Sequence, residues 1–409
     1  MKKLSTIELF SGCGGLVDGF EKSGKYDTLA SVEWKEKQCL VLKQRLKDKY
    51  NYEDADERVL RFDIQRTNEL LKGWKDDEEY GTNEGLLKKV SKPIDLIVGG
   101  PPCQAYSIAG RVQDENSMDY DYRNYLFESY LKVVNVFKPK LFVFENVEGL
   151  LSAKPNGVNI LQKIKDEFNS IGYEIIDDVR KFALLDLSKF GVPQKRKRII
   201  LLGLSKNVFN KDIQVELKYF YSDILAKYQC KDSKTVKDTI GDLPKFFPLE
   251  KEKKIGRKRF SHNPINSEIP DHYPRYHNKR DIEIFRRLAL DIEENTNKYN
   301  SIEKLKELYT EMTGNKSNIH KYNVLRWDSI SNTIPAHLKK DGLRHIHPDY
   351  HQARSITVRE AARLQTFDDD FIFSGNMGAD FEMIGNAVPP LFSYKLANAL
   401  YDFIKKHDL

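Results

Sequence analysis

Short apolar runs that stop at turn or acidic residues recur through the first half of the chain. They are rich in β-branched residues, leucine and phenylalanine, and each is too short for a typical helix. Continuous apolar runs of this length are typical of strands buried on both faces, as in a parallel sheet. The runs occupy residues 5–10, 28–32, 94–98, 140–144 and 199–202.

Helical patterns separate these predicted strands. Apolar residues recur three or four positions apart over 126–137 and 158–168, and we expect further helices within 65–92 and 281–308. Strands that alternate with helices predict an α/β fold with a doubly wound, mostly parallel sheet. Ligands bind such sheets at the carboxyl ends of the strands. The residues that directly follow each run are therefore the first candidates for chemistry.

The pattern changes after about residue 205. Apolar runs become shorter and turn residues more frequent, until a Thr357 capping signal begins a new helix. A turn over 384–390 and an amphipathic helix over Leu391–Lys406 follow. A helical end after a long irregular insertion indicates a return to the first domain. We predict one domain from residues 1–204 completed by 376–409, and a smaller domain from residues 205–375.

Composition narrows the class of protein. The chain has 409 residues, 40% hydrophobic and 31% charged, which is ordinary for a globular protein of two domains. No apolar run approaches the length of a membrane span, and the first residues do not resemble a secretory signal. The four cysteines form no CxxC pair, so we expect a reducing, cytoplasmic location.

The charge pattern permits a polyanionic partner without requiring one. The formal net charge is +6, and basic residues are dense between Lys251 and Arg287, interleaved with Phe260, Tyr273 and Tyr276. This segment is either a surface that follows phosphates or a solvated loop, and the sequence does not choose between them. The histidines at 345, 347 and 351 have no cysteine or acidic partner that would complete a site, so we predict no metal.

A lone cysteine follows the predicted strand at 94–98. Gly99-Gly100-Pro101-Pro102 ends that strand, because proline fixes φ and cannot donate to the sheet. Cys103 is thereby delivered to the carboxyl end of a strand. On this segment alone, a nucleophile and a small buried cysteine are equally good interpretations.

A glycine turn follows the first predicted strand. Ser11-Gly12-Cys13-Gly14-Gly15 leads into a short helix, although its spacing is not that of dinucleotide enzymes. Glu33 lies about 20 residues further on, where a carboxylate can accept hydrogen bonds from ribose hydroxyls. Asp63 ends a third candidate strand and could meet an adenine amino group. Together these positions favour a ribose-bearing cofactor.

Further charged residues follow the later strands. Glu145 comes directly after the strand at 140–144, so it and Cys103 can converge at one sheet edge. Arg196 and Arg198 share one face of a strand, although a solvated basic edge is the better interpretation of that pair alone. The polar stretch 105–122 lacks a clear period and suggests a lid over the site.

Six motifs in order resemble the DNA (cytosine-5)-methyltransferases of prokaryotic or phage restriction–modification systems, and they span residues 10–390. Each motif alone is modest, but the ordered set is specific. They are Phe10-Ser-Gly12-Cys-Gly14-Gly15, Gly100-Pro-Pro102-Cys103-Gln104, Glu145-Asn146-Val147, Gln194-x-Arg196-x-Arg198, Arg363-Leu-Gln365 and Gly385-Asn386-x-Val388.

The resemblance implies a Rossmann-like methyltransferase domain with a target-recognition domain at 205–375. It implies that Cys103 adds to C6 of cytosine so that C5 can accept a methyl group, and that Glu145 engages N3 and the exocyclic amine. Arg198 would hold the O2 side of the base, with support from Arg196. The cofactor would be S-adenosyl-L-methionine, which leaves as S-adenosyl-L-homocysteine, with no metal.

The remaining site residues carry over by position. The cofactor set comprises Phe10, Ser11, Gly12, Cys13, Gly14, Gly15, Glu33, Trp34, Asp63, Ile64, Gly100, Pro102, Leu126, Asn386 and Val388. Gln104, Ser107 and Arg123 would contact DNA, and residues 104–124 would close over a flipped base.

The resemblance also implies partners. We expect double-stranded DNA as substrate, no membrane association, a monomer, a cytoplasmic location with attachment to the nucleoid through DNA, and a cognate restriction endonuclease that acts independently. Transfer RNA is an alternative substrate, because one lineage of the family uses it. A DNA-binding protein or repressor without turnover is a third hypothesis, although such a chain would tolerate loss of Cys103 or Glu145.

Overall fold

The computed structural model describes residues 3–102, 126–154, 157–209, 212–265, 267–318 and 320–408. The chain divides into two compact units. Unit 1 comprises Met1–Phe190, Arg196–Lys231 and Ala387–Leu409, and unit 2 comprises Gly191–Lys195 and Asp232–Asn386.

The boundaries of these units differ from those of the predicted domains, which lie between residues 204 and 205 and between residues 375 and 376. Residues 205–231 stay with unit 1 because they pack on its sheet. Tyr221, for example, donates from its hydroxyl to the carbonyl of Ile200 at 2.7 Å and accepts from the backbone N–H of Leu202 at 2.9 Å. The role of each domain stays a prediction.

Unit 1 is built on one eight-stranded sheet, in which the first five strands are parallel. The central strands are buried along their length, as continuous apolar runs predict. This sheet confirms the predicted α/β fold class. Its order is β3 (Val59–Arg61), β2 (Tyr26–Glu33), β1 (Leu4–Leu9), β6 (Leu96–Gly99), β7 (Leu141–Val147), β11 (Lys197–Ser205) and β8 (Tyr173–Ile175), with β9 (Leu184–Asp186) also paired to β11.

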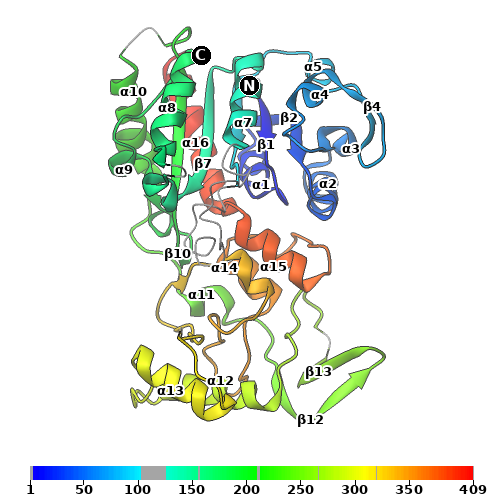
Figure 1. The fold of residues 1–409 in the computed structure, drawn as a ribbon, viewed down its shortest axis with the longest axis vertical. Helices are drawn as coiled ribbons and strands as arrows, with labels where there is room; N and C mark the ends of the chain where they lie inside the picture. The colour runs from blue at the N-terminus through cyan, green and yellow to red at the C-terminus, as the bar shows by residue number, and fades with distance from the viewer. Residues whose placement is uncertain are drawn as a thin grey trace. The chain divides into compact units, whose positions relative to one another are not determined.

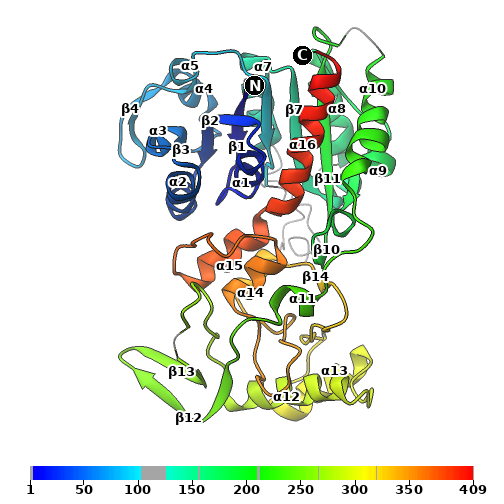
Figure 2. The same cartoon turned by 180° about the vertical axis from the view of Figure 1, so that it is seen from behind.

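Helices cover both faces of this sheet (Figures 1 and 2). On one face, Phe168 of α8 stacks on Phe142 of β7, with ring centroids 4.1 Å apart. On the other face, the hydroxyl of Tyr26 in β2 donates to the carbonyl of Ala397 in α16 at 2.7 Å. The helices are α1 (Gly15–Lys22), α2 (Glu36–Tyr50), α3 (Ala55–Arg58), α4 (Thr67–Lys72), α5 (Leu86–Lys89), α7 (Leu126–Phe137), α8 (Ile160–Ser170), α9 (Val179–Phe182), α10 (Ile213–Tyr219) and α16 (Pro390–Lys406).

Strand β11 runs antiparallel to β7, β8 and β9, so the sheet is mixed at this edge. Arg198 belongs to β11, whereas Arg196 lies between β11 and the two-residue strand β10 (Gln194–Lys195). Their spacing predicts that the two arginines share one strand, but they do not belong to one regular strand.

The segment 65–92 is helical only in part. Between α4 and α5 the chain forms the hairpin of β4 (Trp74–Asp77) and β5 (Gly81–Asn83). Two glycines with φ of 104° and 68°, Gly73 and Gly81, supply the turns that a helix would not permit.

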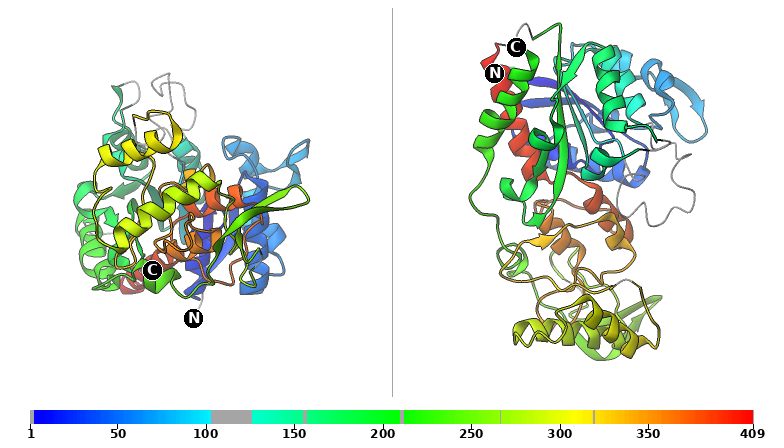
Figure 3. Two further views of the ribbon diagram at one scale, coloured as in Figure 1. Left: turned by 90° about the horizontal axis from the view of Figure 1, so that it is seen from below. Right: turned by 60° about the vertical axis from the view of Figure 1, so that its left-hand side comes forward.

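The described residues of unit 2 form helices, two pairs of strands and two isolated bridges rather than a large sheet. The basic segment after Lys251 forms a long hairpin and then a loop (Figure 3). The elements are β10 paired with β14 (Ser331–Asn332), β12 (Phe247–Ile255) paired with β13 (Lys258–Asn263), α11 (Val236–Ile240), α12 (Lys279–Glu293), α13 (Ile302–Thr313), α14 (Val358–Leu364) and α15 (Met377–Asn386).

The helical pattern at 281–308 is two helices, α12 and α13. The carboxylate of Asp291 accepts hydrogen bonds from the backbone N–H groups of Lys298 and Tyr299, at 2.7 and 3.1 Å, and this folds the connecting loop back. Asn295 and Asn297 adopt positive φ there, which asparagine tolerates. The turn predicted at 384–390 is also shorter, because α15 continues to Asn386 and α16 begins at Pro390.

A buried ion pair organises the core of unit 2. Arg354 donates two hydrogen bonds of 2.7 Å to the two carboxylate oxygens of Glu360. Glu360 also completes the capping box that begins α14 at Thr357, as the sequence predicts. His347 lies 3.5 Å from the same carboxylate. Removal of either charge would leave the other buried alone, at a cost of about 3–5 kcal/mol.

Three further observations concern membrane-spanning helices and metal ligands. Among the described residues, no helix is both long and apolar enough to cross a membrane. Within the same residues, no three histidine, cysteine or acidic side chains lie close enough to bind a metal ion. His345 instead lies 3.1 Å from the carbonyl oxygen of Thr333.

We expect unit 2 to lose stability at mildly acidic pH. Burial lowers the pKa of His262 and His345 to about 4 and that of His347 to about 3. The unfolded chain binds protons at these histidines near pH 6.5, whereas the folded chain does not, so the free energy of unfolding decreases as pH falls from about 6.5 towards 4. Thermal unfolding between pH 8 and 4 measures this.

His347→Gln should make that pH dependence shallower, because the titration of one buried histidine is removed. His351→Gln is the matched control, since His351 is exposed. An equal slope for the wild type and His347→Gln would contradict the assignment.

Candidate functional site

The carboxyl ends of four neighbouring strands meet at one edge of the unit 1 sheet. β1 lies between β2 and β6, with Leu9 opposite Val32 and Gly99, and Gly99 lies opposite Phe144 of β7. The residues that follow these strands are therefore neighbours, although they are far apart in sequence.

The chain passes Glu145 very closely as it leaves β6. A Cβ on Gly100 would lie 2.6 Å from Oε2 of Glu145, closer than real carbon–oxygen contacts allow. One residue further on, the side-chain amide of Asn146 donates to the carbonyl of Pro101 at 3.3 Å. A side chain at position 100 would therefore require the Glu145 carboxylate to move.

Glu145 forms an ion pair with Arg198. Arg198 lies opposite Val147 in the antiparallel pairing, so Glu145 is its diagonal neighbour on the same face of the sheet. The Nε of Arg198 is 2.9 Å from Oε1 of Glu145, and the two side chains are only 15% and 13% exposed. The sequence interpretation of a solvated basic edge is therefore wrong for Arg198.

Arg196 is buried and holds a different segment. Its Nη2 donates to the carbonyl of Ala387 at 2.9 Å, in the short link between α15 and α16. Its charge still acts on Glu145, whose pKa it lowers together with Arg198. Arg196 therefore holds the chain next to Val388 and adds positive charge near Glu145.

The surroundings of Glu145 favour the protonated form of its carboxyl more than water does. Burial raises its pKa, and the charges of Arg198 and Arg196 offset this only in part. A carboxyl whose pKa is raised keeps its proton to a higher pH than an exposed one and can donate it to a ring nitrogen.

Cys103, Gln104, Ser107 and Arg123, with the predicted lid at 104–124, lie outside the described residues. The structure follows this segment as far as Pro102. Two other cysteines, Cys13 and Cys39, are buried, and burial raises the pKa of Cys39 to about 12. A thiol with that pKa is a poor nucleophile.

The glycine turn after β1 is tied to the acid after β2. Gly12, at φ 57°, donates from its N–H to Oε2 of Glu33 at 2.9 Å. Phe10 also has a positive φ, 58°, which is uncommon outside glycine and is found at ligand sites. Gly15 lies so close to the carbonyl of Val388 that a Cβ would be 2.4 Å from it.

The residues expected to bind the adenosine part lie around this turn. Burial raises the pKa of Glu33, an effect that backbone donors such as Lys35 and Gly12 reduce. The ring of Trp34 next to it is 46% exposed, which suits stacking on a base. Asp63 accepts from the N–H of Gln65 at 3.0 Å, and Ile64 is buried.

The carboxylate of Glu33 and the exposed Trp34 suit an adenosyl group. Both oxygens of Glu33 are held by backbone N–H groups but keep free lone pairs for ribose hydroxyls. The other expected residues divide between the units. Ser11, Cys13, Gly14, Gly100, Leu126 and Val388 belong to unit 1, and Asn386 ends α15 in unit 2.

Sequence reasoning missed Glu8, a buried carboxyl within β1. Its carboxylate accepts a hydrogen bond from the backbone N–H of Val17 in α1, whose N-cap residue, Gly14, has no side chain to do so. Burial raises the pKa of Glu8 well above its usual value, and Glu33 and Glu21 add to this. An acidic residue inside an apolar strand was the signal that could have found it.

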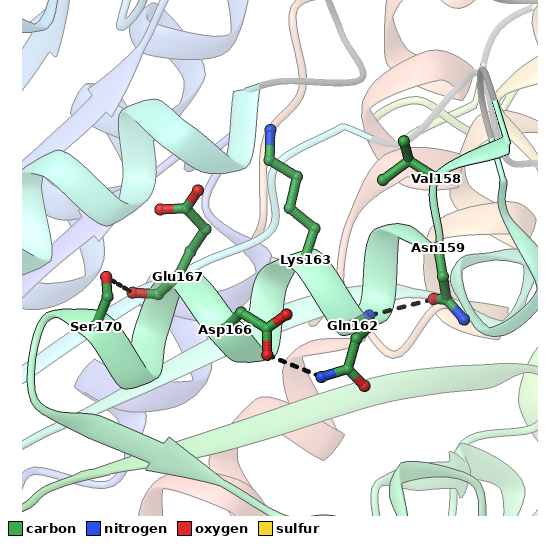
Figure 4. Close-up of a pocket in the computed structure, with 7 residues that line it drawn as sticks. All are labelled: Val158, Asn159, Gln162, Lys163, Asp166, Glu167 and Ser170. Carbon is green, nitrogen blue, oxygen red and sulfur yellow. Dashed lines mark hydrogen bonds between the residues drawn. The ribbon is translucent and has the colours of Figure 1, made fainter.

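A surface pocket lies elsewhere, along α8 (Figure 4). The backbone N–H of Gln162 donates to the side chain of Asn159 at 3.2 Å within α8, and Lys163 donates to Glu128 of α7 at 2.8 Å. None of the predicted site residues lines it. This pocket is therefore not part of the candidate site.

Sequence comparison identifies the family. The profile described as C-5 cytosine-specific DNA methylase matches residues 4–402. Type II methyltransferase M.Bpa9945I of Bacillus paralicheniformis is 35% identical, over 98% of this chain and 99% of its own. Putative type II methyltransferase M.OihORF3336P of Oceanobacillus iheyensis is 30% identical, over 98% and 96%.

Solved structures support the fold. A putative DNA modification methyltransferase encoded within a prophage of E. coli has a TM-score of 0.59 at 23% identity, covering 98% of this chain and 100% of that chain. The Dnmt2 methyltransferase of S. pombe has a TM-score of 0.54 at 14% identity, with complete coverage of both chains.

The chain belongs to the C-5 cytosine-specific DNA methylase family. It is a DNA (cytosine-5)-methyltransferase. Its substrate is DNA, and the reaction class implies S-adenosylmethionine as methyl donor.

Gly100→Ala should reduce kcat by about 100-fold, because the new Cβ displaces Glu145, which is expected to act on the base, and a shift of about 1 Å at such a group has an effect of this size. Steady-state methylation of duplex DNA measures it. Gly378→Ala in α15 is the control, because its Cβ would meet nothing closer than Asn376 at 3.6 Å. Wild-type activity in Gly100→Ala would contradict the geometry.

Proposed function

We propose that this enzyme methylates C5 of cytosine at a specific sequence of duplex DNA, through a covalent bond between Cys103 and C6 of a base turned out of the helix. The observation that supports this most is the Glu145–Arg198 pair. It lies beside the strand end that leads directly to Cys103.

The chemistry needs this pair because C5 of cytosine is a weak nucleophile. When the thiolate of Cys103 adds to C6, the C5–C6 double bond opens and electron density moves to C5 and towards N3. Glu145 stabilises that density by a proton or hydrogen bond at N3, and Arg198 by a charge beside O2. After methylation, loss of the C5 proton and release of the thiolate restore the ring.

The bound cofactor would supply an electrophilic methyl group to C5. Glu33 would accept hydrogen bonds from the ribose, Trp34 would stack on the adenine, and Asp63 with Ile64 would contact its edge. Phe10, Ser11, Gly12, Cys13, Gly14 and Gly15 would surround the methionine part, with Gly100, Pro102, Leu126 and Val388 completing the pocket.

A base inside a stacked duplex cannot reach these groups, so it must flip out. Residues 104–124 would close over it, and Gln104, Ser107 and Arg123 would contact the DNA. In unit 2, the β12–β13 hairpin carries exposed Lys253, Lys254 and Arg257, which suits contacts with phosphates. We assign target recognition to unit 2.

Its biological role would be protection of DNA from a cognate restriction endonuclease that acts independently, as the type II names of its relatives suggest. The enzyme would act as a monomer in the cytoplasm, associated with the nucleoid through DNA. Bisulfite sequencing of a host that expresses it would reveal the methylated site.

Duplex DNA with 5-fluorocytosine at the methylated position should form a stable adduct with the enzyme, because fluorine cannot leave as a proton does. Mass spectrometry should locate the adduct on Cys103, and Cys103→Ala should form none and methylate no DNA. An adduct on Cys13, Cys39 or Cys230, or an active Cys103→Ala, would contradict the mechanism. The same assay with transfer RNA tests the alternative substrate.

Glu145→Gln should lower kcat about 10²- to 10⁴-fold, because the amide has no acidic proton to donate. The protonated carboxyl is the active form, so the wild-type kcat should fall as pH rises through the raised pKa of Glu145. That decline should be absent in Glu145→Gln. Glu148→Gln is the matched control, since Glu148 is exposed.

A further inference from the structure

The β4–β5 hairpin, residues Trp74–Asn83, contains none of the site residues named above, and its sequence gave no sign of a role. It nevertheless packs directly on the segment that carries Asp63 and Ile64. That segment follows β3, which is three residues long and forms the edge of the sheet. β3 pairs with β2 on one side only, so the sheet does not support its outer side.

An aromatic cluster joins the hairpin to this segment. The indole of Trp74 stacks on the ring of Phe62, with centroids 3.9 Å apart and planes 22° from parallel. Tyr80 meets the same ring edge-on at 5.0 Å. Trp74 and Tyr80 are themselves tied, because the indole N–H donates to the carbonyl of Tyr80 at 3.1 Å. Phe62 and Trp74 are both buried.

Charged contacts reinforce the aromatic cluster. Arg66 forms an ion pair with Asp77 of β4 at 2.6 Å, and its guanidinium lies 4.8 Å from the centre of the Phe62 ring. Asp77 also accepts from the N–H groups of Glu79 and Tyr80, at 3.0 and 2.9 Å, which fixes the hairpin turn.

Phe62 is the residue through which these contacts reach the cofactor site. Its backbone N–H donates to the carbonyl of Glu33 at 3.0 Å, and Asp63 is its neighbour in sequence. A movement of the Phe62 ring would therefore shift the groups expected to bind the ribose and the adenine edge together.

We propose that the Trp74–Asn83 hairpin is a positioning element for the adenosine end of the cofactor. It holds Phe62 from the side that the sheet leaves open, and so sets the distance between Glu33 and Asp63. This inference rests on the cofactor site proposed above.

The test is calorimetric binding of S-adenosyl-L-homocysteine and of adenosine alone to the full-length protein. Trp74→Leu removes the stacking and should weaken both ligands by about tenfold, the factor that corresponds to the loss of an aromatic pair. Trp74→Phe keeps a ring on Phe62 and should recover most of the affinity. In turnover, KM for the methyl donor should rise while kcat and the Kd for DNA stay unchanged.

Asp77→Asn is a milder variant that retains the turn acceptor and removes only the charge facing Arg66. It should weaken both ligands by about two- to threefold, as partly exposed ion pairs contribute little. Lys75→Ala is the control on the same hairpin, because its side chain is 83% exposed. It should bind both ligands as the wild type does.

Glu33→Gln distinguishes failure of the hairpin role from failure of the proposed cofactor site. If Glu33→Gln weakens binding but folded Trp74→Leu and Asp77→Asn bind normally, the hairpin role is overturned and the cofactor site stands. If Glu33→Gln also binds normally, the cofactor site itself falls. If Trp74→Leu does not fold, Asp77→Asn decides, and wild-type affinity in that variant overturns the proposal. An equal loss of DNA binding in Trp74→Leu would show general structural damage and overturn it as well.

Discussion

The contact between Glu145 and Arg198 lies where water has little access, and the end of β7, the start of β11 and the chain at Gly100 are arranged around it. The pairing register of β7 and β11 makes the two residues diagonal neighbours on one face of the sheet. The same carboxylate occupies the space beside Gly100, so a Cβ at this position would displace it. One set of contacts thus determines the position of the acid, of its basic partner and of the chain that enters the segment containing Cys103.

The residues expected to bind the adenosine part of the cofactor depend on a second set of contacts, in which backbone N–H groups hold Glu33. Gly12 and Lys35 donate to Glu33, and Glu33 in turn accepts at its carbonyl from Phe62. Hydrogen bonds from the backbone hold a carboxylate without neutralising it, so it stays able to accept from a ligand. β3 is an edge strand, and the contacts from the β4–β5 hairpin replace the neighbour that the sheet does not provide.

Unit 2 is stabilised differently, because its described residues form no large sheet. Its core is organised by a polar network in which Arg354, Glu360 and His347 are all buried and in contact. Such a network specifies one arrangement strongly, since each charge needs its partner. The consequence is sensitivity to acid, because the pKa of His347 is lowered by burial and its protonation competes with folding.

The sequence by itself determined the strands of the parallel sheet, the glycine turn and the acidic residues at strand ends, because these features depend on local patterns. The Thr357 capping box and the helix at 126–137 were predictable for the same reason. Only the tertiary structure decided that β11 runs antiparallel, that Arg198 pairs with Glu145 and that the Trp74 hairpin packs on Phe62. Those contacts join residues brought together by strand order and burial, and neither is encoded in the spacing of neighbouring residues.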